Sequence, residues 1–381
     1  MIRVGIVFML NDNWLGGINY YRNLINAVYC TPDRQIEFVI ITDSDVAKLK
    51  DFQHLEIIKT QLFERFSVAW FLRKISIKLF KNDFLLSQLL RKNNINVLSH
   101  SGWLSKSSKI PTVGWIPDFQ HIHLPKFFTE NELKLRDKAF SEICNFCTKV
   151  IVSSNDALKD LQAFAPNAAN KAIVMQFAVP PKKPNTKLIP LDVLKSRYNF
   201  DEPFYLLPNQ FWAHKNHKIV IEALAILKKQ NYKITVLATG NTSDHRQPNF
   251  FSSLEKLIES SDVKDDFKVL GMIPQNDLEV LFHYACAIIN PSLFEGWSTT
   301  VEEAKTLGKK VILSDIAIHR EQKPRFGAYF EPNDANKLAC LLKEYVDINH
   351  VSELNINEVE EAFINYGVTY QNIVNNVVHK G

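Results

Sequence analysis

Residues 290–308 read NPSLFEGWSTTVEEAKTLG, and this stretch predicts a glycine-containing loop followed by a helix. The apolar run Ala287–Ile289 leads into it and is typical of a buried strand. TTVE has the form of a capping box, with Thr299 as N-cap and Glu302 at N3, and Gly308 stands where a helix-terminating glycine is expected. A helix N-terminus after such a loop presents unpaired N–H groups and a positive dipole end. We therefore expect an anion site here, typically for a phosphate.

Two carboxylates frame this anion site. Glu295 lies in the loop and Glu303 in the first helical turn, eight positions apart (303 − 295 = 8). Negative side chains beside a phosphate are better suited to accept hydrogen bonds from hydroxyl groups on either side of it. A molecule with hydroxyl groups that flank a diphosphate is a nucleotide sugar. The alternative is that Glu302 and Glu303 are ordinary helix N-terminal charges.

The composition is that of a globular protein with two domains. The chain has 381 residues, of which 46% are hydrophobic and 23% charged. The formal net charge of +4 is modest, so nucleic acid is not expected as a partner. No apolar run reaches the ~20 residues of a membrane span. Five cysteines, an odd number, favour reduced thiols, so we expect a cytoplasmic protein.

Three segments together resemble the retaining GT-B glycosyltransferases of family 4, or glycosyltransferase group 1, of the surface-polysaccharide type. They are FEGWSTTVEEAKTLGKKVILSD (294–315), which has a Glu-x7-Glu pattern, PNQFWAHKNH (208–217) and VLGMIPQNDLEVLFHYACAIINPS (269–292). The resemblance is strong over about residues 204–335 and weaker in the first half. It implies an α/β protein of two Rossmann-like, doubly wound parallel-sheet domains with an interdomain cleft. Apolar runs that alternate with helical patterns agree with this fold class.

The expected domain division has four parts. Residues 1–180 are expected to form an acceptor-binding domain, 181–200 a proline-rich linker, and 201–355 a nucleotide-sugar-binding domain. The segment 356–381 is expected to be helical and, as in the family, to cross back to the first domain. The expected strands are Ile2–Leu10, Ile36–Thr42, Val97–His100, Thr112–Ile116, Val150–Ser153, Ala172–Met175, Phe204–Leu207, Ile234–Ala238, Phe267–Leu270, Ala287–Ile289, Val311–Ser314 and Ala328–Phe330.

The motif matches imply a donor-binding site. Lys215, beside His214, matches the family's phosphate-binding lysine. Gln210 stands where the family usually has an arginine, so one cation is missing. Glu303 is implied to bind the ribose, and Glu295 to lie near the hydroxyl groups of the transferred sugar. The other implied donor contacts are Gly16 and Gly17, in an expected loop before a helix at 19–29, and Gly271, Met272, Ile273, Gly296, Trp297, Ser298, Thr299 and Thr300.

The first half offers further catalytic candidates after an expected strand. The family often has a His–Asp pair there, but in this chain Pro117 occupies the histidine position, while Asp118 matches the aspartate. His121 lies nearby, as a substitute for the missing histidine or as a structural residue. With Glu295 and Lys215, Asp118 and His121 complete the set of catalytic candidates.

An Asp-x-Asp motif at Asp43 and Asp45 offers a different mechanism. In the GT-A fold, a motif of this kind holds a divalent metal on the nucleotide. Here it follows only the second expected strand, and carboxylates are ordinary in loops. We therefore expect a surface loop, and neither a metal nor another cofactor.

Residues 63–92 combine large apolar side chains with seven lysines and arginines. A basic amphipathic stretch of this kind can lie on an anionic membrane surface. The alternative is a pair of helices that covers the sheet, with lysines and arginines in solvent. If the acceptor is lipid-linked, the first interpretation is favoured, and this segment would contact the inner face of the membrane.

These features predict a retaining, metal-independent hexosyltransferase. Its donor would be a GDP-, UDP- or dTDP-linked mannose, glucose or rhamnose-like sugar. Its acceptor would be a hydroxyl of a glycan or lipid-linked saccharide, in surface polysaccharide synthesis such as that of lipopolysaccharide. Two alternatives remain: a nucleotide-sugar 2-epimerase of the same fold, and a catalytically inactive nucleotide-sugar-binding subunit, which Pro117 and Gln210 would suit.

Overall fold

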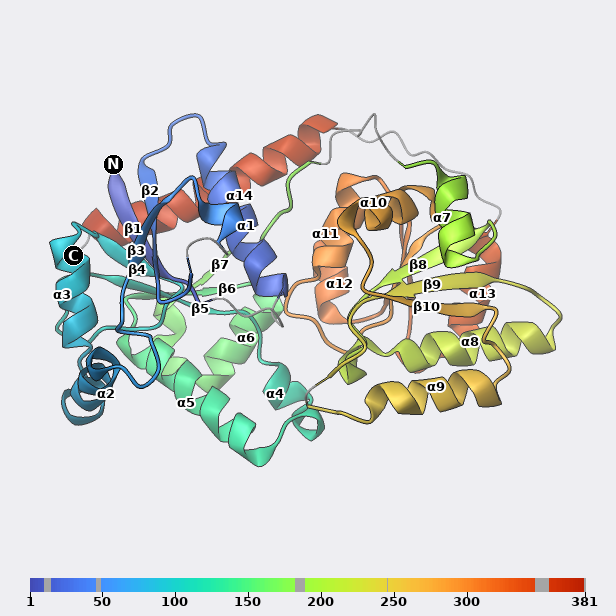
Figure 1. Cartoon of the computed structure of the whole chain (residues 1–381), viewed down its shortest axis with the longest axis horizontal. Coiled ribbons are helices and arrows are strands. Elements are labelled where there is room, and N and C mark those ends of the chain that lie inside the picture. Colours follow the sequence, from blue (N-terminus) through green and yellow to red (C-terminus); the bar gives the residue numbers. More distant parts are fainter. Residues whose placement is uncertain (10–14, 46–48, 182–188, 245, 347–355, 380–381) are drawn as a thin grey trace. The chain divides into compact units, whose positions relative to one another are not determined.

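The computed structural model describes residues 1–9, 15–45, 49–181, 189–244, 246–346 and 356–379. The chain forms two compact units, each a parallel sheet flanked by helices (Figure 1). The first unit comprises Met1–Phe119, Glu130–Pro180 and Glu360–Gly381, and the second comprises Gln120–Thr129 and Pro181–Val359. The prediction of two doubly wound α/β domains is therefore confirmed.

The first unit is built on a seven-stranded parallel sheet. Its strands are nearly continuous apolar runs, which is typical of parallel sheets that are covered on both faces. In spatial order they are β3 (Glu56–Lys59), β2 (Ile36–Thr42), β1 (Ile2–Val7), β4 (Val97–Ser99), β5 (Thr112–Ile116), β6 (Lys149–Val152) and β7 (Ala172–Val174). The helices of this part of the chain are α1 (Leu15–Tyr29), α2 (Val68–Phe80), α3 (Phe84–Lys92), α5 (Glu130–Phe146), α6 (Asn155–Phe164) and the C-terminal α14 (Ile356–His379).

The second unit is built on a six-stranded parallel sheet. In spatial order its strands are β10 (Phe267–Gly271), β9 (Thr235–Thr239), β8 (Phe204–Pro208), β11 (Ile288–Asn290), β12 (Val311–Ser314) and β13 (Gly327–Phe330). Its helices are α4 (Gln120–His123), α7 (Leu191–Tyr198), α8 (His217–Lys229), α9 (Phe250–Ser260), α10 (Gln275–Tyr284), α11 (Thr299–Thr306), α12 (Ala317–Gln322) and α13 (Ala335–Tyr345). The order β10-β9-β8-β11-β12-β13 is that of a dinucleotide-binding Rossmann domain.

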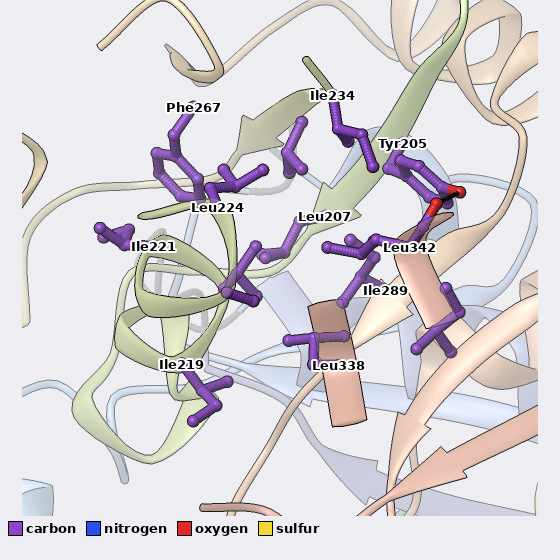
Figure 2. Close-up of a cluster of buried hydrophobic side chains, with 14 of the residues drawn as sticks. Tyr205, Leu207, Ile219, Ile221, Leu224, Ile234, Phe267, Ile289, Leu338 and Leu342 are labelled. Atoms are coloured by element: carbon purple, nitrogen blue, oxygen red, sulfur yellow. Dashed lines mark hydrogen bonds between the residues drawn. The ribbon is translucent and has the colours of Figure 1, made fainter. Parts of the chain in front are cut away.

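Successive residues of β8 enter opposite hydrophobic cores, because strand side chains alternate between the two faces of a sheet. Tyr205 and Leu207 join the core under α8 and α13, shown in Figure 2. There the Tyr205 hydroxyl donates a hydrogen bond to the carbonyl of Leu342, at 2.6 Å. Phe204 and Leu206 join the core on the other face. Burial on both faces explains why the strand is apolar throughout.

Helix α1 begins earlier than its sequence predicts. It starts at Leu15, so Gly16 and Gly17 lie in its first turn and not in a loop. A glycine inside a helix costs about 1 kcal/mol relative to alanine, which is why the two glycines indicated a loop. Packing of the buried side chains of α1, among them Leu24 and Val28, compensates for this cost.

Part of the predicted linker belongs to the second unit. Leu191–Tyr198 form α7, and Leu194 is fully buried in the core beside α10. The carboxylate of Asp277 on α10 accepts hydrogen bonds from Arg197 and Tyr198, each at 2.5 Å. Residues 182–188 of the predicted linker, 347–355 of the predicted second domain and 380–381 of the last segment lie outside the described residues.

The C-terminal helix packs on the first unit. The side chain of Gln371 accepts a hydrogen bond from the backbone N–H of Gln35 at 2.8 Å and donates to the carbonyl of Asp33 at 3.0 Å. Most of this helix therefore belongs to the first unit, although almost 180 residues of the second unit precede it in the chain.

Residues 63–92 form two helices with different environments. Helix α3 buries Leu86 and Leu90, as a helix that covers a sheet should. No residue of α2, all of which the structure describes, is buried. The alternative of two helices that cover the sheet therefore holds for α3 and not for α2. Among the described residues, no helix is long and apolar enough to cross a membrane.

Asp43 and Asp45 follow β2. Asp45 is exposed and Asp43 is partly exposed, as expected for a surface loop. Within the described part of the chain, no three His, Cys, Asp or Glu side chains form a group that could hold a metal ion.

Candidate active site

The strand order of the second sheet reverses between β8 and β11. In open α/β sheets, ligands bind beyond the carboxyl ends of the strands at such a point. The loop after β8 carries Lys215, and the loop after β11 carries Glu295. The N–H of Leu293 donates to the carbonyl of His214 at 2.8 Å, so the two loops are joined directly.

Lys215 and Glu295 form an ion pair across this switch point. Lys215 Nζ lies 2.6 Å from Glu295 Oε1, and the two side chains are 16% and 8% exposed. Ser292 Oγ lies 2.6 Å from the same carboxylate oxygen and 2.7 Å from Asn290 Oδ1. Since a hydroxyl has one proton, Ser292 donates to one of these oxygens at a time. The ammonium group has three protons, and within the described part of the chain Glu295 takes one of them, which leaves two for another anion.

The turn that positions Lys215 depends on Asn216. Its backbone is left-handed, with φ of 56°, and it lies between a 3-10 turn at Ala213–Lys215 and helix α8. Asparagine tolerates this conformation better than most residues. Its side-chain amide donates to the carbonyls of Pro291 and Pro332, at 3.2 and 2.9 Å. The turn is therefore tied to the loop that carries Glu295.

The electrostatic balance keeps Glu295 ionised. Burial would raise the pKa of its carboxyl group, but the charge of Lys215 and the hydrogen bonds from Lys215 and Ser292 outweigh burial. The pKa of Glu295 therefore lies below the ordinary glutamate value of 4.5. At neutral pH the site holds a full negative and a full positive charge in contact.

This pKa shift predicts a pH-dependent contribution to stability. A lowered folded-state pKa stabilises the fold at pH values above 4.5, and the contribution disappears as the pH falls through the folded-state value. The Glu295→Gln variant is expected to be less stable than the parent at pH 7, with a difference that shrinks below pH ~4.5. Urea unfolding of both proteins between pH 3 and 7 measures this difference. A constant difference would contradict the charge assignment.

Helix α11 is capped by Ser298, not by Thr299 as the capping-box pattern predicted. Ser298 Oγ accepts the N–H of Val301 at 3.3 Å. It also accepts a hydrogen bond from Asn290 Nδ2 at 2.7 Å, so strand β11 places the cap. The run Ser298-Thr299-Thr300 offers several hydroxyl side chains as N-caps, and the hydrogen bond from Asn290 helps to hold Ser298 in this position.

Glu302 and Glu303 have different environments. Glu302 is buried and accepts hydrogen bonds from Gln322 Nε2 at 2.8 Å and from Lys305 Nζ at 3.1 Å. Burial raises its pKa, with Lys305 opposing the shift. Glu302 is thus part of the packing between α11 and α12. Glu303 is partly exposed in the first turn of α11, where a ligand can reach it.

Two asparagines that the sequence analysis missed connect the strands of the switch point. Asn209, directly after β8, donates from Nδ2 to Asn290 Oδ1 at 3.2 Å, and Thr300 Oγ1 lies 3.4 Å from Asn209 Oδ1. Both asparagines are buried. In the sequence, each of these asparagines stands at the carboxyl end of an apolar strand, the edge at which open α/β sheets bind ligands.

His214, in the loop after β8, and His217, the first residue of α8, are neutral at pH 7. Burial, followed by the positive charges of Lys215 and Arg246, lowers the pKa of His214 well below 6.5. Burial likewise lowers the pKa of His217 to about 3, where its ring stacks on Phe211 with centroids 4.2 Å apart. Gln210 Oε1 accepts the N–H of Asn241 at 2.8 Å. Neither His214 nor Gln210 therefore replaces the charge of the arginine that the family has at position 210.

Arg246 is a second cation in this region that the sequence analysis missed. It lies in the loop after β9, with its guanidinium over the rings of Phe128 and Trp212, 5.3 and 5.1 Å from their centroids. Its Nε lies 3.2 Å from Asp244 Oδ1, and it donates to Gln120 Oε1 at 3.1 Å. A single arginine in a polar loop has no recognisable pattern in the sequence.

The other predicted donor contacts lie in several places. Gly296, Trp297 and Ser298 follow Glu295 in the same loop. Gly271 ends β10 with a positive φ of 66°, and its carbonyl accepts the N–H of Gly240 at 2.9 Å, which places Met272 and Ile273 just beyond the carboxyl edge of the same sheet. Gly16 and Gly17 lie in the first unit, on α1.

The catalytic candidates of the first half fall in different units. Asp118 follows β5 in the first unit, and His121 lies in α4, which groups with the second unit. His121 is buried, with its ring 6.5 Å from that of Phe128. Its neighbour His123 lies 5.2 Å from the ring of Phe294, beside Glu295. The short helix α4 therefore packs near the loop of the candidate site.

Comparison with known sequences agrees with the motifs of the second unit. Residues 193–367 match the family model described as glycosyl transferases group 1. The O-antigen chain mannosyltransferase RfbU of Salmonella typhimurium is 25% identical over 172 residues, which cover 44% of this chain. The match spans 43% of that relative, less than half of its length.

Comparison with solved structures covers the whole chain. A glycosyltransferase from Rickettsia africae has a TM-score of 0.70 at 18% identity, over 100% of this chain and 99% of that one. The Anabaena protein HepE, in complex with UDP-glucose, has a TM-score of 0.65 at 16% identity, over 100% of this chain and 99% of that one. At such identities the likeness concerns the fold, which is GT-B as the sequence predicted.

Proposed function

We propose that this chain, whose residues 193–367 match the family model of the glycosyl transferases group 1 and which has the GT-B fold, transfers a hexose from a nucleotide-diphosphate sugar to a hydroxyl group of a glycan or lipid-linked saccharide. The resemblance to an O-antigen mannosyltransferase favours surface polysaccharide synthesis and a mannose-like donor. The observation that carries the proposal is the buried contact between Lys215 and Glu295 at the switch point of the second sheet.

Departure of the nucleotide diphosphate requires that the growing negative charge on its phosphates be stabilised. In our proposal, the two free protons of the Lys215 ammonium and the N-terminus of α11 supply this stabilisation, without a metal ion. The low exposure of Lys215 strengthens its interaction with a phosphate, because fewer water molecules screen it. The segment Gly296–Thr300 would hold the sugar and diphosphate, and Gly271–Ile273 the base.

The two glutamates would orient the donor from either side of the diphosphate. Glu303 would accept hydrogen bonds from the ribose hydroxyls. Glu295, ionised and held by Lys215, would accept hydrogen bonds from hydroxyls of the transferred sugar. Fixing the donor in this way lowers the entropic cost of reaching the transition state.

The proposed transfer retains the anomeric configuration. The bond from the anomeric carbon to the phosphate oxygen breaks, and the acceptor oxygen bonds to the same face of the sugar. The departing phosphate oxygen takes the proton of the acceptor hydroxyl, so no enzyme nucleophile is needed. Asp118 or His121 would contact the sugar in place of the histidine that Pro117 replaces, and Gly16 and Gly17 would approach the phosphates and the acceptor.

The first experiment is calorimetric binding of a panel of GDP-, UDP- and dTDP-sugars, with and without EDTA, followed by transfer assays with the donor that binds. Binding of one donor in EDTA and retaining transfer support the proposal. An epimerised nucleotide sugar without transfer indicates a 2-epimerase, and binding without turnover indicates an inactive subunit. Binding that requires Mn²⁺ would contradict metal independence and would favour a metal site at Asp43 and Asp45.

The two glutamates are expected to respond differently to mutation. Glu303→Ala should weaken the nucleoside diphosphate and the nucleotide sugar equally, by about 10- to 100-fold, because both contain the ribose. Glu295→Gln should weaken the nucleotide sugar more than the nucleoside diphosphate. Calorimetry with both ligands measures each ratio. Glu222→Ala, a partly exposed position on α8, is the control, and equal effects of Glu303→Ala and the control would remove Glu303 from the site.

A further inference from the structure

Helix α2 presents an apolar stripe to solvent. Val68, Phe71, Leu72, Ile75 and Leu79 are 76%, 50%, 53%, 50% and 67% exposed. Their spacing of i, i+3, i+4, i+7 and i+11 places them on one face of the helix, within a sector of about 100°. Monomeric soluble proteins rarely expose such a continuous apolar surface without a binding partner.

The orientation of α2 is fixed by its opposite face. Trp70, Arg73 and Ile77 are the partly buried positions on that side. The Arg73 guanidinium lies 2.7 Å from the buried carboxylate of Asp83, which also caps α3, and 4.5 Å from the Phe63 ring centroid. Turning the apolar stripe inward would break this ion pair and leave the carboxylate of Asp83 buried without its cation.

Hydrogen bonds at both ends of α2 fix the same orientation. Ser67 Oγ caps the helix by accepting the N–H of Trp70 at 3.0 Å, and it donates to the carbonyl of Gln61 outside the helix at 2.7 Å. Near the other end, Ser76 Oγ donates to the carbonyl of Asn82 at 2.7 Å. In Figure 1, α2 lies at the margin of the first unit, next to α3. Contacts within the first unit therefore hold the apolar stripe facing outward.

The charged side chains between Phe66 and Asn82, the segment that contains the stripe, are all positive. Lys74, Lys78 and Lys81 are exposed, and the sequence from Phe66 to Asn82 contains no aspartate or glutamate. Lys74 and Lys78 lie beside the stripe on the helix surface. Exposed aromatic rings of Phe66 and Phe80 lie at the two ends of the helix. Apolar side chains bordered by lysines are the pattern of a helix that lies in the plane of an anionic membrane surface.

We propose that α2 docks the first unit on an anionic lipid bilayer, with the stripe in the interface and the lysines among the lipid headgroups. The proposal does not depend on the transferase activity. A second copy of this chain is a poorer occupant, because a two-fold contact between stripes brings α2 against α2 and Lys78 of each copy towards the other. An acidic lipid surface satisfies the apolar and the charged parts together.

Flotation of the full chain with phosphatidylglycerol-containing and pure phosphatidylcholine vesicles tests the proposal. The protein is expected to float with the anionic vesicles at low ionic strength, and less as salt rises. Leu72→Glu should lower the vesicle partition coefficient at least ~10-fold, since it places a charge in the apolar interface. The matched control is Leu135→Glu on α5 of the same unit, because that leucine is 57% exposed, close to the 53% of Leu72.

A second pair of variants tests the charges. Lys74→Gln/Lys78→Gln should weaken binding to anionic vesicles several-fold, because each lysine contributes separately near the surface. Lys134→Gln/Lys138→Gln on α5, with the same spacing of four, is the control. Absence of flotation, or equal flotation of Leu72→Glu and Leu135→Glu, would overturn the proposal. A dimer in sedimentation velocity that Leu72→Glu dissociates would assign the stripe to a second copy instead, and would also overturn it.

Discussion

Lys215→Ala is expected to lower the rate of sugar transfer by about 10²–10³-fold, the usual effect of removing one preorganised group that stabilises developing negative charge. The family's arginine is replaced by Gln210, and His214 is neutral, so the proposed mechanism depends on Lys215 more than it would with two cations in the β8 loop. Steady-state kinetics with the donor identified by calorimetry measures the loss in kcat.

A structural effect of this substitution has to be separated from the catalytic one. Lys215→Ala leaves the carboxylate of Glu295 buried without its cation, which typically costs about 3–5 kcal/mol. The double variant Lys215→Met/Glu295→Gln removes both charges and is expected to regain most of that stability while remaining inactive. Lys218→Ala is the matched control, because Lys218 is 63% exposed one turn further along the chain and forms an ion pair with Glu222 on the surface. A folded Lys215→Ala enzyme with the parental kcat would contradict the proposed role.

Gly367→Ala is expected to destabilise the first unit by about 3 kcal/mol or more, because overpacking against backbone atoms is costly. A Cβ at Gly367 on α14 would lie 2.3 Å from the carbonyl oxygen of Ala27 and 2.8 Å from the nitrogen of Val28, both on α1. Backbone atoms of a buried helix cannot move aside as the end of a flexible side chain can. Thermal unfolding should show a melting temperature lower by about 6–12 °C, at 2–4 °C per kcal/mol.

Gly16→Ala is the matched control for stability. Gly16 also lies in a helix, but a Cβ there would have no atom of the described residues within 4 Å. Alanine is the better helix former, so this variant is expected to be as stable as the parent or up to ~1 kcal/mol more stable. Equal melting temperatures for the two glycine variants would show that α14 and α1 are not in close contact.

The sequence alone determined the class of the fold and most of its strands. Ile36–Thr42, Thr112–Ile116 and Val311–Ser314 were predicted with the bounds that the structure has. The reason is that strands of a parallel sheet are buried on both faces, so their apolar character is continuous and local. The strand at Glu56–Lys59 was missed, because at the sheet edge EIIK has charged ends and is only partly buried.

Helix boundaries near glycine and hydroxyl residues required the tertiary structure. Gly16 and Gly17 indicated a loop, since local propensity was all that the sequence offered, whereas packing of α1 extends the helix over them. Thr299 and Ser298 are both good N-caps. Ser298 is held at the cap position by hydrogen bonds with Asn290 of β11 and with Gln322 of α12, and the contact with Gln322 exists only in the folded chain.

The motifs identified Lys215 and Glu295 as candidates, but not that they touch. They are 80 residues apart, and the contact depends on the strand order that makes β8 and β11 neighbours. The neutral state of His214 and the presence of Arg246 likewise depend on burial and on which loops meet. Residue types and the helical or strand pattern are local properties that a sequence displays. Contacts, burial and pKa values arise from groups that only the folded chain brings together.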